Sequence, residues 1–221
     1  MQWDDHAERE EDRYADSVGR LPDEDLDRRQ KQLVRAGMAA TGAGLARLMQ
    51  GRRAEAAGWL ARSAERFRES WEHAPAGSWG RPIGAMKARL LAVDRAGAAN
   101  DARWALELGA AEAESPIGRY AAVLALLTLG EDDEATRLAA TLQAEPVEAF
   151  PPDVADALHA LASADAGGYA EAAGRVLRSF EEREAYLEDI PVADTVIVLE
   201  ALAEARGLAA RPSSTLLPPR A

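Results

Sequence analysis

Apolar residues recur with helical spacing along most of the chain. Between residues 22 and 50 the pattern passes through Leu26, Leu33, Met38, Leu45 and Leu48, and such positions fall on one side of a helix with 3.6 residues per turn. Runs that alternate apolar and polar residues are hard to find, and Val and Ile are scarce, so strands are not expected. About nine helices are predicted, over residues 22–50, 53–73, 81–96, 98–114, 116–129, 131–144, 152–165, 168–187 and 191–206.

A repeated pattern of glycine, acidic residue and alanine organises these helices. Gly51, Gly97, Gly130 and Gly167 are each followed by an acidic residue four positions later and by an alanine five positions later. The intervals between the glycines are 46, 33 and 37 residues, and repeats of about 34 residues are typical of helix–turn–helix solenoids. We interpret each glycine as a left-handed residue that ends a helix. The pattern predicts an all-α protein of stacked antiparallel helical hairpins, either a tetratricopeptide-like solenoid or a compact helical array.

Three regions are expected along the chain. Residues 1–20 are dense in charge and nearly free of aliphatic side chains, which predicts an acidic N-terminal tail, either solvated or a frayed helix. Residues 21–208 should form a single helical-repeat domain. Residues 209–221 contain Pro and Ser and have no helical pattern, so an extended C-terminal tail is predicted. Two loops bounded by prolines, at 75–82 and 145–152, separate hairpins, because a residue that precedes proline disfavours the helical conformation.

Composition narrows the class of protein. The chain has no cysteine, which excludes thiol catalysis, thiolate zinc sites and iron–sulfur ligation and fits a reducing compartment. The first 30 residues lack the apolar core of a signal peptide. The longest apolar stretch, Tyr120 to Leu129, is far shorter than the roughly 20 residues that a membrane helix needs. A cytoplasmic protein without a membrane partner is therefore expected.

The net charge of -12 is unevenly distributed along the chain. Residues 1–27 carry 11 acidic and 3 basic residues, residues 28–95 carry 5 acidic and 14 basic, and residues 96–221 carry 22 acidic and 9 basic. Direct nucleic-acid binding is not expected, because the chain as a whole would be repelled by phosphate and no recognition motif accompanies the basic segment. The basic segment either balances acidic helices of the same fold or forms an interface with a partner.

Three groups of residues are candidates for a chemical site. Asp156 and His159 place a carboxylate and an imidazole on adjacent helical turns, but a di-iron site needs a second such pair, which the chain lacks. The glycine-rich segment 41–44 lies within helical pattern and lacks the spacing of phosphate-binding loops, so it indicates close helix packing.

The third group is a carboxylate cluster near the end of a predicted helix, made of Glu181, Glu182, Glu184 and Glu188. These residues alternate with arginines, which favours ion pairs on an exposed helix over acid–base catalysis. The sequence therefore predicts a protein that is not an enzyme and that has no metal site and no cofactor.

The aromatic residues are more informative. Trp59, Phe67 and Trp71 share one helix face and should form the core of the first hairpin. Trp79 lies in a loop of Gly and Pro residues beside Arg81, and Trp and Arg are the side chains most enriched at binding hot spots. Trp79 is thus a candidate contact for a partner. The alternative is that it seals the loop onto the core.

The C-terminal part of the chain resembles a known family. The segment 185–191 leads into Thr195–Gly207, which contains Ala201-Leu-Ala and ends in Arg206-Gly, and the chain then closes with Ser213 to Pro218. Together with Trp79, Leu90, Leu91 and Arg95, these residues resemble the immunity 49 family of bacterial polymorphic-toxin systems.

The resemblance implies an all-α cytoplasmic antidote that binds and blocks a toxin, and the acidic C-terminal half would suit a basic toxin domain such as a nuclease. The alternative is a helical-repeat adaptor that binds a peptide or helix of another protein. A second copy of the chain is a further candidate partner. The candidate partner-binding residues are Trp79, Arg81, Glu181, Glu184, Glu188 and Asp189.

Overall fold

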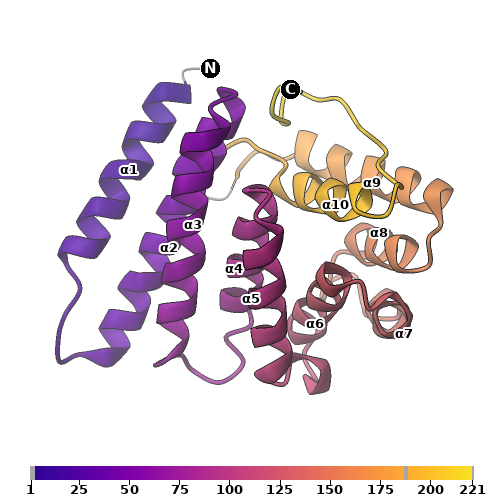
Figure 1. Cartoon of the computed structure of the whole chain (residues 1–221), viewed down its shortest axis with the longest axis horizontal. Coiled ribbons are helices and arrows are strands. Elements are labelled where there is room, and N and C mark those ends of the chain that lie inside the picture. Colours follow the sequence, from indigo (N-terminus) through magenta and orange to yellow (C-terminus); the bar gives the residue numbers. More distant parts are fainter. Residues whose placement is uncertain (1–2, 187–188, 221) are drawn as a thin grey trace.

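A computed structural model describes residues 3–186 and 189–220 of the chain, and within these ranges the protein is helical and has no strands (Figure 1). The described residues form ten α-helices and one short 3₁₀ helix. They are α1 (Trp3–Gly19), α2 (Leu26–Met49), α3 (Arg53–Trp71), α4 (Gly80–Leu91), α5 (Arg95–Glu107), η1 (Ala110–Glu112), α6 (Pro116–Leu129), α7 (Asp132–Gln143), α8 (Pro152–Ala162), α9 (Ala166–Glu181) and α10 (Asp194–Glu204).

The predicted all-α fold class is confirmed, and each of the nine predicted helices is present. The largest difference in bounds is at 98–114, where the structure has α5 followed by η1. Gly109 separates the two because it adopts a left-handed backbone, with φ of 83°, that ends α5.

The prediction of an acidic tail at residues 1–20 is wrong, because residues 3–19 form the helix α1, which packs along α2. Its buried face is made of Ala7, Glu10 and Ser17. The fully buried Glu10 carboxylate is 2.7 Å from an Nη of Arg13, and Gly42 of α2 leaves room for it, since a Cβ there would lie 2.8 Å from Glu10 Cγ. Ala7 is the one apolar residue among these three buried positions, so apolar spacing could not reveal the contact surface.

Carboxylates of α1 pair with basic residues of the segment 28–95. Arg47 of α2 donates to Glu11 of α1 at 2.7 Å, and Arg29 pairs with Glu69 across α2 and α3. Further basic residues of the segment 28–95 pair with carboxylates of the acidic C-terminal part, as Arg68 does with Asp101 at 2.6 Å. Much of the basic segment therefore balances acidic helices of the same fold.

The turns within the four hairpins share one backbone geometry. In each, a left-handed residue follows the first helix, and the next amide donates to a carbonyl five residues earlier. These bonds run from Arg52 to Arg47, from Asp94 to Arg89, from Glu131 to Leu126 and from Asp165 to Ala160. This turn gives the last carbonyls of the first helix hydrogen-bond partners, and the next helix begins directly after it.

Two of the four glycines predicted to end helices do not do so. Gly51 and Gly130 are left-handed, but Gly97 and Gly167 lie in the first turns of α5 and α9. Val93 and Ala164 take the left-handed position instead, with φ of 59° and 56°. In the second hairpin the glycine serves the helix start: Asp94 accepts from the Gly97 amide at 2.9 Å, and a Cβ on Gly97 would collide with that carboxylate.

The hairpins α2–α3, α4–α5, α6–α7 and α8–α9 follow one another along the array. Helices α2, α4, α6 and α8 contact one another in turn and form the inner layer. The last helix, α10, turns back and packs against α4, α8 and α9. The described C-terminal residues beyond 208 contain neither helix nor strand, and they run back over α10 (Figure 1), where the Ala193 amide donates to the Leu216 carbonyl at 2.9 Å.

No helix within residues 3–186 and 189–220 combines the length and the hydropathy needed to cross a membrane.

We expect Gly44→Ala to destabilise the fold. A Cβ at Gly44 would lie 2.7 Å from Leu60 Cγ, so α2 and α3 would have to move apart, at a cost of about 1–3 kcal/mol in the free energy of unfolding. Gly58→Ala in α3 is the matched control, because nothing lies within 4 Å of the added Cβ; it should stabilise by about 0.5–1 kcal/mol. Urea unfolding measures both, and equal effects would contradict the close-packing interpretation.

Val93→Gly should stabilise the protein although it removes a side chain. Val93 is β-branched, exposed and left-handed, so relief of backbone strain should exceed the entropy that glycine adds to the unfolded chain, by about 0.5–1 kcal/mol. Val147 is equally exposed and its φ is not positive. Val147→Gly should therefore destabilise slightly, and a loss of stability in both variants would show that Val93 is unstrained.

Candidate functional site

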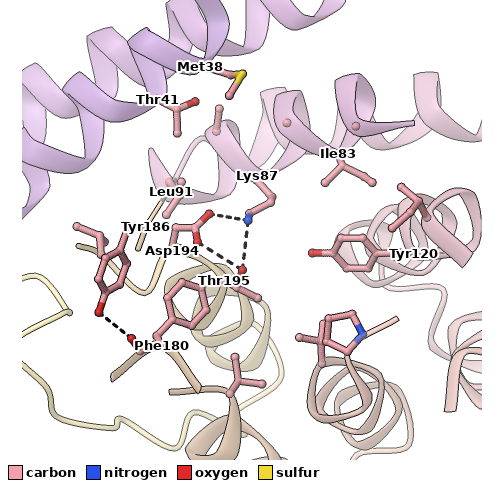
Figure 2. Close-up of a pocket in the computed structure, with 18 of the residues that line it drawn as sticks. Met38, Thr41, Ile83, Lys87, Leu91, Tyr120, Phe180, Tyr186, Asp194 and Thr195 are labelled. Carbon is pink, nitrogen blue, oxygen red and sulfur yellow. Dashed lines mark hydrogen bonds and ion pairs between the residues drawn. The ribbon is translucent and has the colours of Figure 1, made fainter. Parts of the chain in front are cut away.

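The inner helices, α10 and three of the connections between helices surround a cavity of about 1120 Å³. One wall is a single face of α2 that presents Val34, Met38, Thr41 and Leu45 at intervals of three and four residues. Part of this wall is visible in Figure 2, where Met38 and Thr41 face the helix that carries Lys87. Most of the remaining wall is aliphatic or aromatic. It comes from Phe67 of α3, from α4, from the starts of α6 and α8, from the end of α9 and from the connections at 144–151 and 182–193, and the connection at 72–79 adds Ser78.

A polar cluster joins two sides of the cavity. Lys87 Nζ donates to Asp194 Oδ2 at 2.6 Å and to Thr195 Oγ1 at 3.3 Å, which links α4 to the first turn of α10 (Figure 2). The hydroxyl end of Tyr120, from α6, points into the cavity on the side where Lys87 lies (Figure 2). These three helices are distant in the sequence. Lys87 and Asp194 hold α4 to α10, and Tyr120 of α6 faces the same cavity.

The environment shifts the titration of this cluster. Burial by itself would lower the pKa of Lys87, but the charges of Asp194 and Tyr120 and the hydrogen bond to Asp194 outweigh burial and raise that pKa. Burial is the main reason why the pKa of Tyr120 is raised. At neutral pH the cavity therefore holds the ammonium of Lys87 beside the neutral phenol of Tyr120.

Arg81, at the start of α4, is the most unusual charge in the cavity wall. Its residue is 9% exposed, and its Nη2 donates to the amide oxygen of the buried Gln30. Its Nε is buried without a hydrogen-bond partner, and no carboxylate of the described residues pairs with it. Burial lowers the pKa of Arg81, as expected for a cation whose desolvation is not offset by an opposite charge.

The cavity wall carries more positive than negative charge. Its charged residues are Arg81, Lys87, Arg183, Asp153 and Asp194. Asp194 is paired with Lys87, and Asp153 accepts from Arg175, outside the wall, at 2.6 Å. Arg183 lies over the Phe180 ring, with 3.8 Å between its guanidinium carbon and the ring centroid. A chain with a net charge of -12 thus encloses a cavity with two arginines that no carboxylate of the wall neutralises.

The structure places the six candidate partner-binding residues in different surroundings. Trp79 is half-buried, and its ring lies 5.7 Å from that of Trp71, so it packs the α3–α4 connection onto the core as the alternative interpretation had it. Arg81 faces the cavity. The others belong to the region between α9 and the tail: Glu181 accepts from Ser214 at 2.7 Å, Glu184 and Asp189 are exposed, and Glu188 lies outside the described residues.

The other predicted core aromatics also differ in burial. Phe67 is buried, against Gly37 and Gly84, whereas Trp59 and Trp71 are half-buried. Trp59 contacts Tyr14 of α1 edge-on, with 5.4 Å between the ring centroids. Phe67 alone of the three reaches the cavity wall.

The Asp156–His159 pair is not arranged as a metal site. The Asp156 carboxylate is already bonded to Arg175 and to Gln143, at 2.7 and 2.8 Å. Among the described residues, no three His, Asp or Glu side chains are grouped so that they could hold a metal ion.

Sequence reasoning missed Lys87, Tyr120 and Asp194. A weak signal was present for Lys87, which is one of only two lysines in the chain and interrupts an otherwise apolar helix face between Ile83 and Leu91. Asp194 and Tyr120 had no such signal, because an acidic residue at a helix start and a tyrosine in an apolar helix are both common.

No known family model, curated protein or solved structure matches the chain. The resemblance to the immunity 49 family therefore rests on the residues quoted above.

We expect Lys87→Met to cost about 1–3 kcal/mol in the free energy of unfolding, because it leaves Asp194 half-buried without its cation. The double variant Lys87→Met/Asp194→Leu should recover part of that loss, since both charges are then removed. Strict additivity of Lys87→Met and Asp194→Leu in urea unfolding would mean that the pair does not couple α4 to α10.

The free energy of unfolding should fall in alkaline solution. Lys87 and Tyr120 have raised pKa values in the folded state, so above the unfolded values of about 10 the folded chain binds more protons than the unfolded chain. Their contribution is complete below pH about 10 and is lost as the pH rises through the folded pKa values. Tyr120→Phe should make the decline shallower in urea unfolding across this range, whereas a decline as steep as that of the unmodified chain would contradict the shift.

Proposed function

We propose that the chain is a non-catalytic binding protein that holds an apolar segment of a partner protein in its cavity. The observation that carries the proposal is the apolar cavity itself, whose wall is formed by side chains from every inner helix and from α10. Its volume of about 1120 Å³ lies above the roughly 300–1,000 Å³ of typical small-molecule sites. This size favours an occupant with several side chains.

The edge of the cavity supports a protein partner. Four large apolar side chains are exposed among the described residues, and two of them, Ile117 and Val147, belong to the cavity wall. They come from the start of α6 and from the α7–α8 connection. Exposed apolar residues at the edge of an apolar cavity extend the surface that a partner can cover.

A second candidate function is the toxin-neutralising immunity protein implied by the resemblance, which would act by stoichiometric binding. Several residues that carry the resemblance lie at the cavity: Leu91, Tyr186, Ile190 and Thr195 line it, and Leu216 of the tail is buried nearby against the start of α10. The connection between α9 and α10 also bears the exposed carboxylates Glu182, Glu184 and Asp189, which would attract a basic toxin domain.

The cavity proposal is tested with edge variants that have matched controls. Ile117→Asp and Val147→Asp place charges at the edge of the cavity, whereas Leu26→Asp and Val93→Asp place them at positions of similar exposure, 46% and 68%, that do not belong to its wall. Proteins that co-purify from the native cell with the unmodified chain should be lost with the first pair and retained with the second. Equal retention by both pairs would refute the proposed binding site.

The toxin-neutralising version makes a separate prediction about salt. Affinity for the toxin encoded by the neighbouring gene, measured by calorimetry, should fall as ionic strength rises, because exposed charges are screened. The double variant Glu182→Gln/Glu184→Gln should weaken binding and flatten the salt dependence. Glu171→Gln is the control: it removes an exposed carboxylate near the other end of α9, far from the connection, and should change little. Absent binding, or binding indifferent to salt, would count against the electrostatic attraction.

A further inference from the structure

Arg81 has more hydrogen-bonding capacity than the fold uses. A guanidinium carries five N–H donors, and in the described residues only one contact is made, from Nη2 to the Gln30 amide oxygen. Gln30 is itself oriented by Asp27, whose carboxylate accepts from Gln30 Nε2 at 3.1 Å. Asp27 therefore positions the amide that holds Arg81 and does not pair with Arg81 directly.

A buried cation without an opposite charge is unfavourable. Desolvation of a guanidinium costs several kcal/mol unless an opposite charge or a full set of acceptors replaces water. The other buried or half-buried arginines meet this requirement: Arg47 pairs with Glu11, Arg119 with Glu145 and Arg206 with Asp132. Arg81 differs from them, because its free donors lie in the wall of the cavity.

We infer that Arg81 is an anion-binding subsite of the cavity, where it pairs with a carboxylate carried by the otherwise apolar segment of the partner. The inference rests on the proposed function and adds to it the chemistry of the occupant. The carboxylate is either the C-terminus of that segment or an acidic side chain within it.

Three features favour an occupant that carries a carboxylate on an otherwise apolar segment. The guanidinium fork matches the two oxygens of a carboxylate. The cavity wall, which includes Val34, Phe67 and Ile117, offers apolar contacts to the rest of the occupant. A polyanion such as a nucleic acid is disfavoured because the chain outside the cavity is strongly acidic.

The test uses the full chain and two pairs of probes that differ in the head group alone. The first pair is acetyl-trileucine with a free C-terminal carboxylate and the same peptide amidated. The second pair is decanoate and decanol, which report whether a free amphipathic acid behaves in the same way. Binding is followed by chemical-shift changes at cavity residues such as Arg81, Lys87 and Tyr120 in the unmodified chain, in Arg81→Gln and in Arg95→Gln, which changes an exposed arginine at the start of α5.

The peptide acid should bind roughly tenfold to a hundredfold more tightly than the amide, as expected for a hydrogen-bonded charge pair. Arg81→Gln should abolish this preference, and Arg95→Gln should retain it. The comparison of acid and amide on the unmodified chain is decisive by itself if Arg81→Gln does not fold.

The remaining outcomes separate the two proposals. If acid and amide bind equally well in the cavity, the subsite is wrong and the proposed function stands. If decanoate binds in an Arg81-dependent manner and neither peptide binds, the occupant is a free amphipathic acid, and a partner segment is ruled out. If no probe shifts the cavity residues, the proposed function fails and the subsite fails with it.

Discussion

The contact between α10 and α4 determines what kind of surface this protein presents. Four hairpins in a row would leave an open concave face, but α10 turns back and is joined to α4 by the ion pair between Asp194 and Lys87. The cavity is closed on this side because α10, which also packs against α8 and α9, reaches back to α4. Without the contact, the residues of the α2 and α4 faces would form an exposed apolar strip, which proteins tend to cover.

Charge is distributed differently inside and outside the cavity. Arginines of the basic segment neutralise α1 and parts of the acidic half, as Arg47 and Arg68 show, and the remaining carboxylates give the exterior its acidic character. The cavity keeps two arginines, Arg81 and Arg183, that no carboxylate of its wall balances. A partner that complements both surfaces would be basic where it meets the exterior, and the segment that enters the cavity would be acidic or neutral.

Most of the fold could be predicted because the helices are Leu- and Ala-rich with regular apolar spacing. The exception is α1, whose buried positions include Glu10 and Ser17, so its packing depends on a paired carboxylate that no hydropathy pattern reveals. The candidate site was harder to predict. Met38 and Leu45 have the same spacing whether a helix face meets the core or a cavity, and Arg81 looks like a surface residue until the fold buries it. Contacts between α4 and α10 depend on the path of the whole chain, which local patterns do not encode.

The connections between helices alternate in length, and the two kinds have different freedom to change. Every residue of the short turns, such as 92–94 and 163–165, has a structural role, because each one is left-handed, makes a turn hydrogen bond or caps a helix. The longer connections at 72–79, 144–151 and 182–193 have eight residues or more, and each contributes to the cavity wall. Substitutions in the longer connections can therefore remodel the cavity wall while the short turns keep the hairpins in place, so that the shape and chemistry of the cavity can diverge over evolutionary time faster than the architecture.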